Sequence, residues 1–170
     1  MSIAIRKFEE KDIPLKVKWI NDEKNNRYLH YDLPLKEEKT LKWFRNLSNR
    51  TDRADYTIII GDEPIGLIGL LSIDLKNMKA EYYICLGEEK YKGRGIAQAA
   101  TKLLIYTAYK EFGLNKIYLY TEISNVGAQR LFERAGFVRE GLSKNDIIHN
   151  GQLLDRYVYG LNIKRYMQSE

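Results

Sequence analysis

Residues 90–97 read KYKGRGIA, and this stretch decides the predicted fold. It follows a segment with strand character and opens a long segment with helical periodicity. Backbone N–H groups at the start of a helix bind anions, because they have no acceptor within the helix. Gly93 and Gly95 let the main chain approach a phosphate closely. Lys92 and Arg94 add positive charge. The stretch therefore predicts a phosphate-binding loop; the alternative is a structural turn whose glycines are coincidental.

Two well-defined phosphate-binding motifs do not fit this loop. A Walker loop requires the string G-x-x-x-x-G-K-[ST], which the sequence does not contain. A dinucleotide-binding loop requires a third glycine near position 98, which is Gln98 here, and a preceding parallel strand. The residues before the loop instead predict an antiparallel meander.

The segments next to the loop predict this meander and a long helix. We expect strands at Tyr56–Ile60, Ile65–Ile73 and Glu81–Leu86, the first two joined as a hairpin. Apolar residues at helical spacing predict a helix from Ile96 to Phe112, which Gly113 ends.

The outer segments complete an α/β (α+β) pattern. Asp12 is expected to cap a helix that holds Pro14 in its first turn. The other expected elements are a strand at Ile3–Arg6, helices at Lys36–Leu47 and Val126–Ala135, and strands at Lys116–Glu122, Phe137–Leu142, Asn145–His149 and Gln152–Leu161. This alternation of strands and helices predicts a mixed sheet with helices on both faces. No repeat, linker or composition break divides the chain, so we expect one domain, residues 1–170.

Composition excludes several classes of protein. The 170 residues are 44% hydrophobic and 30% charged, as in ordinary globular domains. One cysteine, Cys85, excludes an internal disulfide framework and a multi-cysteine zinc site, and two distant histidines argue against a metal centre. Apolar runs are too short to span a membrane, and residues 1–6 show no signal-peptide pattern, so we expect a cytoplasmic protein without a membrane partner. The net charge of +5 is scattered; it serves solubility or a polyanionic ligand, either a phosphate-bearing cofactor or nucleic acid.

A second stretch, residues 125–137 with the sequence NVGAQRLFERAGF, completes the pattern. Together the two stretches resemble the GNAT superfamily of acetyl-CoA-dependent N-acetyltransferases. The first is similar to that family's [RQ]-x-x-G-x-[GA] loop, with Lys90 where Arg or Gln is usual, and the second to its N-x-x-[AS]-x-x-L-[YF]-x-x-x-G-F segment. The hairpin at Asn150-Gly151 is most similar to the ribosomal-protein alanine acetyltransferase (RimJ/RimL-like) branch, which also holds polyamine, antibiotic and nucleotide-sugar acetyltransferases.

The resemblance implies a GNAT-like fold and a place for acetyl-CoA. The central, mostly antiparallel mixed sheet would be splayed at the acetyl-CoA site. The implied pyrophosphate-binding residues are Lys92, Gly93, Arg94, Gly95, Ile96 and Ala97; those beside the pantetheine arm are Ile84, Cys85 and Leu86. Asn125 would bind the cofactor, cap a helix, or do both. Phe132 occupies the place where many relatives have a tyrosine that protonates the departing thiolate, so it belongs to the core or to the wall of the cofactor slot.

The resemblance also implies catalytic roles. The backbone N–H of Leu86 is the candidate that polarises the thioester carbonyl. Glu81 is either the general base or an exposed strand carboxylate. Cys85 would support a ping-pong route as a nucleophile, or it is a small packed strand residue, which favours direct attack of the amine in a ternary complex. Tyr118, Tyr120 or solvent could replace the missing acid.

The acceptor site is expected at residues 21–35, 76–80 and 145–155. Five acidic residues there would attract a cationic amine or are solvated surface: Asp22, Glu23, Asp32, Asp146 and Asp155. The leading hypothesis is an N-acetyltransferase that acts on a primary amine of a small metabolite, an amino sugar or a protein N-terminus, with a homodimer as an expected assembly. The alternative is a catalytically impaired CoA-binding module of the same fold. A nucleic-acid-binding domain is not expected, because the basic residues form no stripe.

Overall fold

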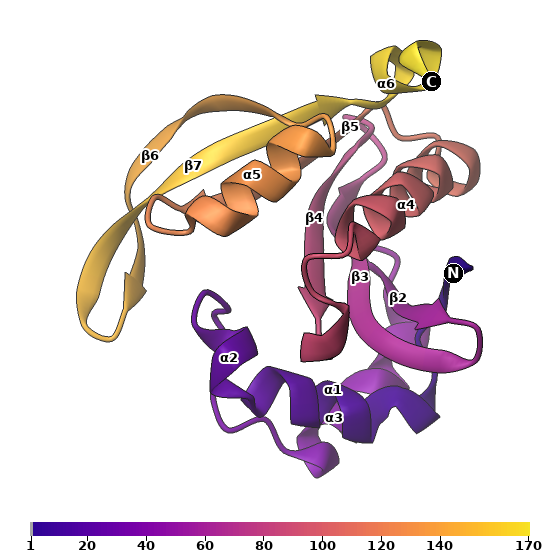
Figure 1. Ribbon diagram of the computed structural model, residues 1–170, viewed down its shortest axis with the longest axis vertical. Coiled ribbons are helices and arrows are strands. Elements are labelled where there is room, and N and C mark those ends of the chain that lie inside the picture. The colour runs from indigo at the N-terminus through magenta and orange to yellow at the C-terminus, as the bar shows by residue number, and fades with distance from the viewer. Residues whose placement is uncertain (1) are drawn as a thin grey trace.

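Seven strands form one mixed sheet in the computed structural model, which describes residues 2–170 (Figure 1). The strands are β1 (Ile3–Lys7), β2 (Ala54–Ile60), β3 (Glu63–Asp74), β4 (Lys79–Leu86), β5 (Lys116–Glu122), β6 (Val138–His149) and β7 (Gln152–Asn162). Their order in the sheet is β1-β2-β3-β4-β5-β7-β6. All neighbours are antiparallel except β4 and β5, which are parallel. This architecture confirms the predicted mixed, mostly antiparallel sheet.

Six α-helices accompany the sheet within residues 2–170. They are α1 (Ile13–Asn21), α2 (Glu23–Asn26), α3 (Glu37–Asn46), α4 (Ile96–Phe112), α5 (Val126–Arg134) and α6 (Ile163–Ser169). Figure 1 shows α1, α2 and α3 gathered at one end of the molecule, with α4 and α5 on either side of β4. None of these helices combines the length and apolar character needed to cross a bilayer.

Two hydrophobic clusters lie on opposite faces of the sheet, because side chains of a strand alternate. Along β4, Ala80 and Tyr82 belong to the larger cluster, which contains α4 and α5. Tyr83 and Cys85 belong to the smaller one, which contains α1 and α3. Helices therefore cover both faces, as predicted. The alternation also assigns the odd-numbered residues of β4 to the α1–α3 side.

The sheet is splayed between β4 and β5. These strands pair at only three positions, Lys79 with Lys116, Ala80 with Ile117, and Glu81 with Tyr118. Beyond this point β5 continues with β7 as its partner as far as Glu122, while β4 continues with β3. The last residues of β4 consequently have no partner strand on the β5 side, which confirms the predicted splay.

Several local predictions were wrong. The expected strands Phe137–Leu142 and Asn145–His149 form one strand, β6, which is bent by register shifts and contains Asn145 at φ +50°. The helix α6 was not expected; Asn162 starts it by accepting a hydrogen bond from the Arg165 N–H at 2.9 Å.

Asp12 does not cap α1 with its side chain. Its buried carboxylate instead accepts hydrogen bonds from the Arg6 guanidinium at 2.7 and 2.8 Å and from the Thr57 hydroxyl at 2.8 Å. It therefore connects the start of α1 to β1 and β2, and the long-range contacts outweigh the local capping preference.

Candidate active site

The loop before α4 has the backbone that a phosphate requires. Gly93 and Gly95 have φ of +72° and +74°, in the left-handed region that favours glycine. A Cβ built on either glycine meets no atom within 4 Å, so the space above the loop is open. Gly95 precedes α4 without a side-chain cap, and the N–H groups of the first turn have no acceptor within the helix. The buried side chains of Ile96 and Ala97 fix this turn against the core.

Two of the three cations of this loop, Lys90 and Lys92, are engaged with side chains outside the glycine turn. The Lys92 ammonium donates to Asn25 Oδ1 at 2.8 Å and to Glu89 Oε2 at 3.0 Å, so it ties the loop to α2. Lys90 forms an ion pair with Glu63 at 2.7 Å. The exposed Arg94 side chain has no hydrogen bond or ion pair to any of residues 2–170. Arg94 is thus the loop cation that is free to meet an anion.

The end of β4 directs two backbone N–H groups into the splay. The Gly87 N–H donates to the Ile65 carbonyl at 2.9 Å, which makes these residues a hydrogen-bonded pair. Such pairs alternate in an antiparallel ladder with pairs whose N–H groups point outward. In the register of β3 and β4, the N–H groups of Ile84 and Leu86 therefore point away from β3, toward the side that β5 has left. The Cys85 backbone, by contrast, faces β3.

The second motif has a structural role in this chain. Asn125 Oδ1 accepts from the Ala128 N–H at 3.2 Å and caps α5, so its cap role is confirmed while its amide nitrogen stays available. Phe132 is 8% exposed, and its ring meets those of Tyr82 and Phe137 at centroid distances of 5.8 and 5.9 Å. Phe132 is therefore a core residue, and its expected place on the wall of the cofactor slot stays a prediction.

A cavity of about 570 Å³ lies on the other face of β4, between the sheet and the α1–α3 side. Side chains of Glu81, Tyr83 and Cys85 line it from the strand. Helices α1 and α3, the segment 28–35, β3, β7 and Arg53 just before β2 supply most of the rest, including Lys16, His30, Tyr31, Trp43 and Arg156. A larger cavity of about 1000 Å³ contains only Gly95 among the expected site residues, so the volume alone does not identify the site.

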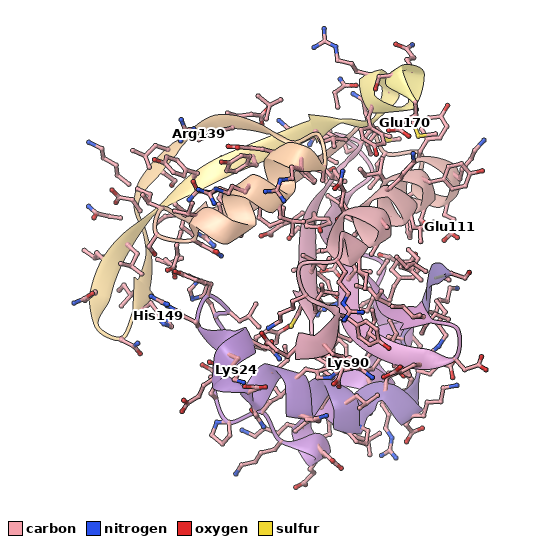
Figure 2. All side chains as sticks on the ribbon, in the orientation of Figure 1. Lys24, Lys90, Glu111, Arg139, His149 and Glu170 are labelled. Carbon is pink, nitrogen blue, oxygen red and sulfur yellow. The ribbon has the colours of Figure 1, made fainter. Side chains whose placement is uncertain are left out.

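Only part of the expected acceptor region lines this cavity. The segment 21–35 contributes, but the turn 76–80, the hairpin residues 145–155 and the five acidic residues named above do not; from β7 only Arg156, just after the expected range, lines the cavity. Asp146 instead accepts from Arg156 Nε at 2.5 Å. Figure 2 labels His149 near the tip of the β6–β7 hairpin, and the His149 ring lies 5.1 Å from the His30 ring between centroids. The hairpin thus meets the segment after α2 at one end of the cavity.

Burial changes the acid–base properties of the cavity floor. Burial raises the pKa of Glu81, and the nearby Arg156 opposes this only in part. Burial also raises the pKa of the Cys85 thiol to about 11, so this group is a protonated thiol at neutral pH. A carboxylate with a raised pKa suits a general base, whereas a neutral thiol is a poor nucleophile.

Sequence reasoning missed Lys16. It is 5% exposed, and burial lowers the pKa of its ammonium to about 8. The signal was present in the sequence, because Ile13, Lys16 and Ile20 follow the spacing of one helix face. A lysine at the centre of an apolar stripe is unusual enough to mark a special position.

Comparison with known proteins agrees with the geometry. A family model described as acetyltransferase (GNAT) domain matches residues 2–138. Spermidine N(1)-acetyltransferase of Vibrio cholerae is 30% identical over 123 residues, which cover 70% of each chain. The N-acetyltransferase p20 of Bacillus licheniformis, which is uncharacterized, is 26% identical over 169 residues, 96% of this chain and 94% of that protein. YdaF of Bacillus subtilis, whose name assigns it to the ribosomal N-acetyltransferases, is 33% identical over 105 residues, which cover 62% of this chain and 56% of that protein.

Solved structures share the whole fold. The crystal structure of the Vibrio cholerae spermidine N-acetyltransferase in complex with CoA and spermine superposes with a TM-score of 0.89 at 21% identity, covering 97% of this chain and 98% of that one. At this identity the likeness concerns the fold. Because the family model covers most of the residues and includes both motifs, the chain belongs to the GNAT family of acetyl-CoA-dependent N-acetyltransferases.

Proposed function

We propose that this protein transfers the acetyl group of acetyl-CoA to the primary amine of an acceptor by direct attack in a ternary complex. The observation that carries the proposal is the position of the free end of β4. It leads into the glycine loop, it borders the splay, and its Glu81 side lines the 570 Å³ cavity. Donor and acceptor would therefore meet along one strand.

The donor would bind through backbone groups. The N–H groups of residues 93–98 would hold the pyrophosphate, with Arg94 as the added charge, and the open space above Gly93 and Gly95 fits that group. The pantetheine arm would lie in the splay as an extra strand beside Ile84–Leu86. Asn125 would contact it through its amide nitrogen. The two N–H groups that point outward on β4 support this arrangement.

Strand spacing bears on the oxyanion donor. At about 3.3 Å per residue, Glu81 lies about 10 Å along β4 from Ile84 and about 17 Å from Leu86. The N–H of Leu86 was the expected donor, but Ile84 has the same orientation and lies nearer the base. We propose that one of these two N–H groups donates to the thioester carbonyl and the other to the pantetheine arm. Loss of one such donor typically costs about 3 kcal/mol of the activation barrier.

Glu81 would remove the proton from the acceptor. An amine of pKa ~10.4 is only about one part in a thousand neutral at pH 7, so a base is needed. Glu81 would accept the proton of the ammonium through a water molecule; the neutral nitrogen would then attack the thioester carbon, and the C–S bond would break to leave the amide and the CoA thiolate. Cys85 would stay a protonated thiol. The CoA thiolate, with a pKa of ~8.5, would leave with a proton from solvent, because Phe132 offers none.

A specific observation also favours a second candidate, a CoA-binding module without catalysis. Phe132 is buried in the core where many relatives carry an acidic hydroxyl. An assay of acetylated product by mass spectrometry, with acetyl-CoA and a panel of polyamines, amino sugars and peptide N-termini, separates the candidates. Product formation that Glu81→Gln slows by about 100-fold supports the enzyme, whereas tight acetyl-CoA binding with no product on any amine supports the module. A cytoplasmic location and a homodimer stay predictions.

A further inference from the structure

Lys16 is a buried cation without an anionic partner. Its ammonium lies 3.6 Å from the centroid of the Trp43 ring, and the rings of Phe8 and Tyr31 are 5.7 and 5.9 Å away. It makes no hydrogen bond or ion pair with any of residues 2–170. Aromatic faces attract a cation, but they do not replace the hydrogen bonds that water gave the ammonium. The ammonium therefore has no hydrogen-bond acceptor among residues 2–170, and the side chain lines the cavity.

The other charges of the cavity are arranged differently. Arg53 forms two hydrogen bonds of 2.7 Å with Asp55, and Arg156 is neutralised by Asp146. These pairs leave Lys16 and the exposed Lys39 as the uncompensated cations of the lining, opposite a single lining carboxylate, Glu81. The cavity thus has an excess of positive charge around Lys16.

We propose that the acceptor is a primary amine that also carries a phosphate or carboxylate group, and that Lys16 binds this anion. The proposal rests on the proposed acetyl transfer and adds the class of acceptor. An anion at Lys16 would supply the missing hydrogen bonds and charge in a desolvated place, where such a bond is strong.

The geometry keeps the two ends of the acceptor apart. The charge of Lys16 acts on Cys85 and Asp55, whereas Arg156 acts on Glu81. Cys85 and Glu81 are four residues apart on β4, which corresponds to about 13 Å. An acceptor with its anion at Lys16 can therefore direct its amine toward Glu81 and the splay. A polyamine would place a second cation next to Lys16, which is unfavourable.

A matched series of acceptors tests this charge preference. The series is 6-aminohexyl phosphate, 6-aminohexanoate, 6-aminohexanol and 1,6-diaminohexane, with spermidine as a longer polycation. At saturating acetyl-CoA, we expect kcat/KM to be at least about tenfold higher for the two anionic acceptors than for the alcohol, and lowest for the polyamines. The ratio between phosphate and carboxylate identifies the preferred anion. A higher kcat/KM for the diamine or spermidine than for both anionic acceptors would overturn the proposal.

Variants assign the effect to Lys16. Lys16→Met should lower kcat/KM for the anionic acceptors by about 10- to 100-fold, through KM, and change it for 6-aminohexanol by less than about twofold. Lys42→Met removes the same charge from the exposed side of α3, outside the cavity, and should change neither. An equal loss on all acceptors with Lys16→Met would mean that the residue is structural, and would contradict the assignment.

A binding measurement covers the case in which none of these amines reacts. With the protein saturated by CoA, 6-aminohexyl phosphate should quench the fluorescence of Trp43, and Lys16→Met should abolish this quenching. No response in the CoA-saturated protein would overturn the proposal. A failure of acetyl-CoA itself to bind contradicts the proposed function instead, so the two failures are distinguishable.

Discussion

Glu81 and Tyr118 form the last paired position between β4 and β5. The residue proposed as the base therefore lies where the sheet opens, with its side chain lining the 570 Å³ cavity and its strand leading to the loop before α4. The next residues of β4 have free backbone groups on the β5 side. This arrangement makes each proposed role separable by substitution.

Glu81→Gln should lower kcat by about 100-fold and leave the KM for acetyl-CoA unchanged, because general base catalysis is lost while the donor site is intact. Burial raises the pKa of Glu81 above the ordinary 4.5. The base works when deprotonated, so wild-type kcat/KM should rise with pH through this raised pKa, and the variant should lose that limb. Glu38→Gln, an exposed carboxylate on α3, is the control. A variant with the wild-type pH profile would remove Glu81 from the mechanism.

Gly93→Val and Gly95→Val should raise the KM for acetyl-CoA at least about tenfold, because a side chain would occupy the space assigned to the phosphates. Both positions have positive φ, so strain alone will also cost about 1–2 kcal/mol of stability. Gly61→Val reproduces that strain, since Gly61 has φ +59° and open space around it, but it is in the β2–β3 turn. Thermal melts should show similar destabilisation in all three variants, whereas steady-state kinetics should show a raised KM for acetyl-CoA only in Gly93→Val and Gly95→Val. The same KM in all three variants would contradict the proposed donor site.

Lys16→Met should stabilise the free protein at pH 7 by up to about 3 kcal/mol. The difference between a pKa of 10.5 in the unfolded chain and about 8 in the fold corresponds to about 3 kcal/mol against folding, which a neutral side chain of similar length avoids.

The pH dependence of this effect has a defined sign. Between pH 8 and 10.5 the unfolded chain holds the Lys16 proton and the folded protein releases it, so wild-type stability should rise with pH across this window. The advantage of Lys16→Met should shrink over the same window. Urea unfolding at pH 7, 9 and 10.5 measures both trends. A variant that is several kcal/mol less stable than wild type at pH 7 would contradict the claim that the buried charge of Lys16 opposes folding.

Cys85→Ala should retain kcat within about threefold. The thiol has a raised pKa of about 11, and direct attack by the amine does not use it. Intact-mass spectrometry after mixing wild-type protein with acetyl-CoA alone should find no acetylated enzyme. An acetyl adduct that disappears with Cys85→Ala would establish the ping-pong route instead.

Local sequence patterns were sufficient for the parts of this molecule that local physics controls. The periodicity from Ile96 and the glycine at 113 gave the bounds of α4, and the two spaced motifs indicated a splayed sheet around a phosphate loop. The bent β6 was divided in two because its polar bulge region resembles a turn. The partners of individual side chains could not be predicted: Lys92 donates to Asn25, which is distant in sequence, and Asp12, instead of capping α1, accepts from Arg6 and from the distant Thr57.

The residues that line the candidate acceptor cavity could be identified only from the three-dimensional structure. Acidic residues of the loops seemed suited to a cationic amine, yet the cavity is lined mainly from α1, α3, β4 and the segment 28–35, and its buried cation outside any ion pair among residues 2–170 is Lys16. This lysine shares a helix face with Ile13 and Ile20, but only the packed structure reveals that Trp43 from another helix covers it.

The proposed acetyl transfer depends first on an acetyl-CoA site at the loop before α4 and the free end of β4, and a binding measurement tests this site. Isothermal titration calorimetry of the purified protein with acetyl-CoA, and separately with CoA, should give micromolar dissociation constants for both, since the pyrophosphate and pantetheine supply the contacts. Gly93→Val should weaken both to a similar degree while Gly61→Val does not. The absence of binding to wild-type protein, with and without an amine acceptor present, would contradict the account.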